Sequence, residues 1–147
     1  MQRLVLASIL FLAAASNAFA QVAVKDPWVR ATVPQQKVTG AFMQLTASGD
    51  TRLVAARSPV AQVVEIHEMT LSGNVMKMGA VSGIDLPSGK SVELKPGGYH
   101  VMLIDLKRQI REGDLVPITL VFEGKDKKRE TVEVKARARS LPAAGGM

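Results

Sequence analysis

The segment that decides the fold is QVVEIHEMTLSGNVMKMGAV, residues 62 to 81. It contains two short runs rich in β-branched and apolar residues, separated by Ser72-Gly73, and glycine supplies the backbone freedom that a chain reversal needs. We therefore expect one strand at Gln62–Thr70, a tight turn at Ser72-Gly73 and a second strand at Val75–Val81. The segment predicts an antiparallel hairpin.

Soft and borderline metal donors gather in this hairpin and in one later strand. Three pairs of donors are spaced two residues apart, which places both members on one face of an extended strand: His67 with Met69, Met76 with Met78, and His100 with Met102. With Ser72-Gly73 as the loop, His67 faces Met78 and Met69 faces Met76, at Cβ distances of about 4.5–5.5 Å. A four-residue loop would keep this register, whereas a three-residue loop would break it.

The chemistry of these donors favours copper. His67 and His100 are the only histidines in the chain, and the chain has no cysteine. Imidazole together with thioether, in the absence of thiolate, favours copper, and thioether favours Cu(I) in particular. Strand alternation places Glu65 on the same face as His67 and turns Glu68 away from it.

Two methionines of the hairpin, Met69 and Met76, are open to more than one interpretation. They can be additional donors, residues just behind the donors, or an apolar collar around the metal. Met43 lies between Phe42 and Leu45 in an expected strand and is interpreted as a core residue, because the flexible thioether fills irregular gaps.

The two ends of the chain have compositions that separate them from the expected domain. Arg3 precedes an apolar run, and small residues end at Ala20, which is the pattern of a secretory signal peptide. We expect cleavage after Ala20, a copper-binding domain over residues 21–139 and a flexible tail over 140–147. The tail ends in Met147, which could add one more thioether.

Composition excludes several functions. Without cysteine there is neither a blue-copper electron-transfer site nor thiol-disulfide exchange. The 19 Lys and Arg residues outnumber the 13 Asp and Glu residues, but they are spread along the chain and aromatic residues are few, so nucleic acid is not an expected partner. The apolar run of the signal is too short for a spanning helix, so stable membrane insertion is not expected.

Strand patterns continue along the rest of the chain, with turns that each contain Gly or Pro. No helix of three turns and no internal repeat is evident. The sequence predicts an all-β fold, an antiparallel β-sandwich with Greek-key connections. The other expected strands are 22–33, 38–47, 52–57, 91–94, 99–105, 115–122 and 130–139.

The donor spacing resembles that of a known family. His67, Met78, His100 and Met102 match H-x10-M-x21-H-x-M, the signature of the periplasmic copper chaperones called PCu(A)C. Other phrases resemble the family as well, among them Trp28-Val-Arg-Ala-Thr32, Gly40-Ala-Phe-Met43 and the run from Leu94 to Leu103. The resemblance implies a cupredoxin-like sandwich that binds Cu(I) through these four residues and delivers copper to the binuclear centre of cytochrome c oxidase.

From this resemblance and the donor chemistry we expect a periplasmic copper carrier that is not an enzyme, with its four donors at one end of the sandwich. Its expected partner is a copper acceptor, either subunit II of cytochrome c oxidase or another copper chaperone. Three alternatives remain: a copper buffer without a dedicated recipient, a module that binds protein or glycan with structural histidines, and a copper redox enzyme.

Overall fold

The computed structural model describes residues 21–141, and this part of the chain contains ten strands and no helix. The all-β expectation is confirmed. The expected signal peptide, residues 1–20, and most of the expected tail, 142–147, lie outside the described residues. The strands are β1 (Val22–Arg30), β2 (Val38–Ala47), β3 (Thr51–Arg57), β4 (Ala61–Ser72), β5 (Val75–Ala80), β6 (Ile84–Leu86), β7 (Ser91–Leu94), β8 (Tyr99–Leu106), β9 (Leu115–Gly124) and β10 (Arg129–Arg139).

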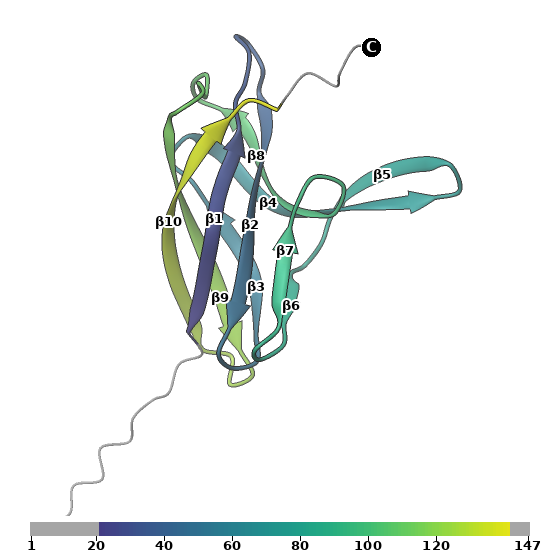
Figure 1. Ribbon diagram of the computed structural model, residues 1–147, viewed down its shortest axis with the longest axis vertical. Coiled ribbons are helices and arrows are strands. Elements are labelled where there is room, and N and C mark those ends of the chain that lie inside the picture. Colours follow the sequence, from purple (N-terminus) through teal and green to yellow (C-terminus); the bar gives the residue numbers. More distant parts are fainter. Residues whose placement is uncertain (1–20, 142–147) are drawn as a thin grey trace, which may run out of the picture.

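All ten strands belong to one sheet that curls around its core (Figure 1). The order is β5-β4-β8-β2-β1-β10-β9-β3-β6, with β7 paired to β2 beside β8. In the strands that form the body of the sheet, alternate residues face inward, where the largest fully buried side chains include Phe122, Leu45, Leu53 and Leu103. Met43 is 2% exposed in this core, which confirms its interpretation as a packing residue.

One pair of strands departs from the antiparallel expectation. β1 and β10 run parallel, with Trp28 beside Arg137 and Arg30 beside Arg139. The two strands are distant in sequence, and no local pattern specifies their relative direction. The short strand β6 was also absent from the sequence prediction, because its three residues carry too little pattern to detect.

The hairpin of β4 and β5 projects from the body of the sheet (Figure 1). β5 pairs only with β4, and all six of its residues are exposed. The described residues contain no helix that is long and apolar enough to cross a membrane.

The predicted register of this hairpin is wrong by two residues. The loop consists of Gly73 and Asn74, so that Ser72 pairs with Val75. Met69 therefore lies opposite Met78 rather than Met76, and His67 lies opposite Ala80. A shift of two residues preserves the face on which each side chain lies, so the histidine and the methionines still share one side.

The cause of the shift is the backbone conformation of the turn. Two-residue hairpin loops require a positive φ at their first position, which glycine adopts without strain and serine does not. Gly73 has a φ of 61°, which suits the first position of a type II′ turn. Placing Ser72 at that position would have imposed the strain on serine.

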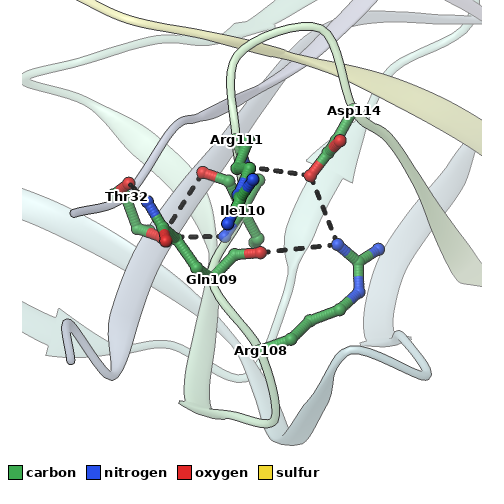
Figure 2. Close-up of polar contacts among 6 residues, drawn as sticks. All are labelled: Thr32, Arg108, Gln109, Ile110, Arg111 and Asp114. Atoms are coloured by element: carbon green, nitrogen blue, oxygen red, sulfur yellow. Dashed lines mark hydrogen bonds and ion pairs between the residues drawn. The ribbon is translucent and has the colours of Figure 1, made fainter. Parts of the chain in front are cut away.

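The loop between β8 and β9 is fastened to the end of β1 by a small polar network (Figure 2). The Thr32 amide donates to the Ile110 carbonyl at 2.7 Å, and the Ile110 amide donates to the Thr32 hydroxyl at 2.9 Å. Asp114 accepts hydrogen bonds from the Arg111 amide and the Arg108 guanidinium. The network therefore ties the start of the connection between β1 and β2 to the loop between β8 and β9.

Candidate metal centre

The pairing of β4 with β8 brings the two histidines together. His67 lies directly opposite His100, with ring centroids 5.7 Å apart, and Glu65 lies opposite Met102. Their neighbours Ile66 and Val101 point into the core, so this row of polar and thioether side chains occupies the outer face of the sheet. The donors therefore lie on the outer face of the sheet, close to where β8 begins.

A cavity of about 210 Å³ opens beside these residues. Three methionines line it, Met69, Met78 and Met102, together with His100. His67 is not part of the wall and reaches the group through its contact with His100. Met76 is not part of the wall either and is 54% exposed on the projecting hairpin.

Thus the structure gathers the four predicted ligands and adds Met69, which lies opposite Met78 across the hairpin. Met102 is 9% exposed, whereas Met78 is 48% exposed. One side of the donor group is therefore set into the sheet, and the other side, on the hairpin, faces solvent.

A row of rings supports His100 from the side opposite His67. Phe42 of β2 lies 6.1 Å from His100 between ring centroids, and Trp28 of β1 lies 4.6 Å from Phe42. The guanidinium of Arg139 lies 5.7 Å from the Trp28 ring centroid, within range of a cation–π interaction. The Phe42 ring also covers Gly40, where an added Cβ would be 3.1 Å from its outermost carbon. The row restricts the movement of the His100 ring.

Each histidine uses one ring nitrogen in a hydrogen bond. Nε2 of His67 lies 2.7 Å from the Glu65 carboxylate, and Nδ1 of His100 lies 3.3 Å from the Gly98 carbonyl oxygen. The remaining nitrogens, Nδ1 of His67 and Nε2 of His100, are buried and have no hydrogen-bond partner. Buried polar atoms are rarely left unpartnered, and a metal ion is one ligand that satisfies an imidazole nitrogen.

Burial also favours the neutral form of His100. Desolvation lowers the pKa of His100 below the usual value, and the nearby His67 lowers this pKa further, while the hydrogen bond to Gly98 opposes both effects. A neutral ring is the form that binds metal ions.

The donor set cannot be completed by nitrogen and oxygen alone. Within residues 21–141, no group of three or more His, Cys, Asp or Glu side chains is arranged to hold a metal ion. The other atoms around the cavity that bind soft metals are the thioethers. A site of two imidazoles and two or three thioethers suits Cu(I) and does not suit a hard cation.

Sequence reasoning placed Glu65 on the face of His67, and the hydrogen bond between them confirms that placement. It missed the ring row of Trp28 and Phe42, and it missed Arg30, which lines the cavity; all three belong to strands distant in sequence from β4. Alternation along β2 could have placed Gly40 and Phe42 on one face, but not that face against β8.

Two of the larger hollows, of about 440 and 430 Å³, lie at the other end of β2. They lie between the β2–β3 and β9–β10 turns, where Asp50 and Lys125 form a 2.8 Å ion pair. Their walls contain neither histidine nor methionine, so size alone does not identify the metal centre.

The fold agrees with known proteins. Residues 22–136 match the family described as "Putative lipoprotein LpqE-like", and the chain belongs to that family, which is of the PCu(A)C type. "Putative lipoprotein Lxx21020" of Leifsonia xyli subsp. xyli is 32% identical over 115 residues, covering 78% of this chain and 69% of the relative. The uncharacterized protein RP573 of Rickettsia prowazekii is 34% identical over 115 residues, covering 74% of this chain and 64% of the relative.

Solved structures show the same architecture. The apo PCuAC domain from PmoF1 superposes with a TM-score of 0.66 at 24% identity, covering 82% of this chain and 94% of that domain, which establishes the fold alone. The solution structure of CuI-DR1885 from Deinococcus radiodurans superposes with a TM-score of 0.63 at 32% identity, covering 86% of this chain and 83% of that one. The expected relationship to PCu(A)C proteins is confirmed.

Proposed function

We propose that this protein is an exported carrier of Cu(I), bound by His67, His100, Met78 and Met102. The observation that carries the proposal is the pair of buried, unpartnered ring nitrogens beside a cavity lined by methionines. Two imidazoles and two thioethers form a neutral set that suits a soft monovalent ion. The Cu(I) form of the similar DR1885 protein supports this choice of cargo.

The exposure of the donors suits a carrier better than a store. Met78 is half-exposed on the projecting hairpin, so an incoming ligand can replace its thioether before the buried donors are disturbed. Thiolates bind Cu(I) more strongly than thioethers do, which gives transfer a direction. We propose a carrier and not an enzyme, as the relationship to the PCu(A)C copper chaperones suggests.

The export pattern and the family support a proposal for the location and the recipient. The lipoprotein description of the family suits an exported protein. We propose that cleavage after Ala20 releases the domain into the periplasm and that the recipient is the copper centre of cytochrome c oxidase subunit II or another copper chaperone. If no acceptor accelerates release, the protein is a copper buffer instead.

An anaerobic Cu(I) competition titration with a chromophoric chelator tests the site. The mature chain should bind one Cu(I), and replacing Met78 and Met102 together by Leu should reduce the affinity strongly. The fold should survive, because the buried replacement at Met102 should lower the free energy of unfolding by less than about 1.5 kcal/mol. Met43→Leu is the matched control, because it makes the same change in the core and should leave affinity unchanged. Unchanged affinity in the double variant would disprove this ligand assignment.

Stopped-flow transfer to a copper-free acceptor domain bearing thiolates tests the carrier role. Direct handover predicts a rate that rises with acceptor concentration, whereas release into solution limits the rate to that of dissociation. A rate that stays flat, and that a small chelator reproduces, would leave only the buffer function.

A further inference from the structure

Glu65 has a position in the cluster that its charge alone does not explain. It shares the outer face of β4 with His67 and lies opposite Met102 of β8. Its Oε2 lies 2.7 Å from Nε2 of His67, and this is its only hydrogen bond to a side chain among residues 21–141. The carboxylate is half-buried at the edge of the donor group, and it contacts the histidine from the side away from the unpartnered nitrogen.

The direction of this hydrogen bond determines which nitrogen of His67 is free. A carboxylate accepts this hydrogen bond, so in the neutral ring Nε2 of His67 carries the hydrogen and Nδ1 carries the lone pair. That Nδ1 is the atom left buried and without a partner. The hydrogen bond therefore selects one of the two neutral tautomers of the ring and holds the ring in one orientation.

His100 is oriented in the opposite way. Its Nδ1 donates to the Gly98 carbonyl, which likewise can only accept, and Nε2 is left free. The two histidines thus offer different nitrogens, Nδ1 from His67 and Nε2 from His100. The main chain of the turn before β8 determines the free nitrogen of His100. The side chain of Glu65, which mutation can remove, determines the free nitrogen of His67.

We propose that Glu65 is a positioning residue for the copper site, and that it makes Nδ1 the metal-binding atom of His67. This inference rests on the proposed function. Partners that orient metal-binding histidines typically change metal affinity by about 10–100-fold when they are removed. Glu65 is not proposed as a ligand, because Glu65, His67 and His100 are not arranged as three donors around a common metal position.

The hydrogen bond itself can be tested in the copper-free protein by ¹⁵N NMR of the imidazole rings. The spectra are recorded at alkaline pH, because each tautomer of a neutral imidazole has a distinct pattern of nitrogen shifts. We expect His67 to be protonated at Nε2 and His100 at Nδ1. Glu65→Leu should give a mixture of tautomers at His67 alone, and Glu65→Gln should keep the native tautomer, because its amide oxygen still accepts.

Copper affinity then shows whether the tautomer matters for binding. Glu65→Leu should weaken Cu(I) binding by about 10–100-fold, and Glu65→Gln should recover affinity to within a few-fold of the parent. Glu68→Leu is the matched control, because Glu68 is the same residue type on the same strand but points to the opposite face. It should change neither the ring pattern nor the affinity. If Glu65→Leu does not fold, Glu65→Ala replaces it.

Three results would overturn the proposal. The first is an unchanged His67 tautomer in Glu65→Leu, and the second is unchanged affinity despite a changed tautomer. The third is a loss in Glu65→Gln as large as in Glu65→Leu with the native tautomer retained, since this would make the carboxylate a ligand or a source of charge. Absence of Cu(I) binding by the unaltered protein would instead refute the proposed function, and the ring shifts would still report on the hydrogen bond.

Discussion

Gly73→Ala tests whether the projecting hairpin holds part of the metal site. Gly73 has a φ of 61°, and an added Cβ would meet nothing within 4 Å, so the substitution introduces backbone strain without a clash. An L-residue in this conformation costs about 1–2 kcal/mol. The hairpin must absorb this cost locally, because β5 pairs only with β4 and an isolated two-stranded hairpin is marginally stable in water.

The expected effect on copper binding follows from the fraction of molecules in which the hairpin is formed. Met78 joins the other donors only in that fraction, and apparent affinity falls in proportion to it. A cost of 1–2 kcal/mol corresponds to a loss of up to about 5–30-fold, and this limit is reached when the hairpin is mostly open in the free parent as well as in the free variant. The thermal unfolding of the body of the sheet should hardly change, because its core does not include β5.

Gly89→Ala is the matched control for this experiment. Gly89 has a φ of 74° and equally open surroundings, but it lies in the turn between β6 and β7, away from the donors. Cu(I) competition titration and thermal melting of both variants give the comparison. If Gly73→Ala and Gly89→Ala have the same Cu(I) affinity, whether or not both have lost affinity relative to the unaltered protein, the hairpin does not contribute to the site.

Three further changes have distinct expected outcomes. Burial lowers the pKa of His100, so on acidification the histidine binds a proton more readily in the unfolded chain than in the folded one. The copper-free protein should therefore lose stability as the pH drops below about 6.5. Between pH 7.5 and pH 5 the melting temperature should fall less for His100→Phe than for the unaltered protein. Thr32→Val leaves the buried Ile110 amide without its side-chain acceptor. It should lower the free energy of unfolding by about 1–3 kcal/mol, which thermal melting would show as a decrease of roughly 4–12 °C in Tm. Cu(I) affinity should not change. Gly40→Ala should push the Phe42 ring toward His100 and weaken Cu(I) binding, which a competition titration would detect; an unaltered affinity would show that the ring moves elsewhere.

Local pattern was enough to predict most strands and the side of the hairpin on which each donor lies. Alternation fixes the face of a residue, so Glu65, His67 and Met78 were assigned to one side before their partners were known. The exact pairing was not predictable by the same means, because it depended on whether Ser72 or Gly73 occupied the strained first position of the turn.

Contacts between distant strands were beyond local pattern altogether. The pairing of His67 with His100 joins β4 to β8, and the ring row joins β1 to β2 and β8. The periodicity of one strand does not indicate which other strand pairs with it in the sheet. Only the resemblance of the donor spacing to a known family indicated that these residues meet, and the free nitrogen atoms of each ring became visible only in the structure.

The parallel pairing of β1 with β10 gives the molecule a polarity. Both strands finish at the same end of the sheet, where Arg30 borders the methionine-lined cavity and pairs with Arg139. β1 begins at the other end, where Val22 pairs with Ala47, a strand length of about 30 Å away. A tether attached before β1 would therefore hold the cargo pointing outward from its anchoring surface, and any extension grafted after β10 would emerge beside the cargo.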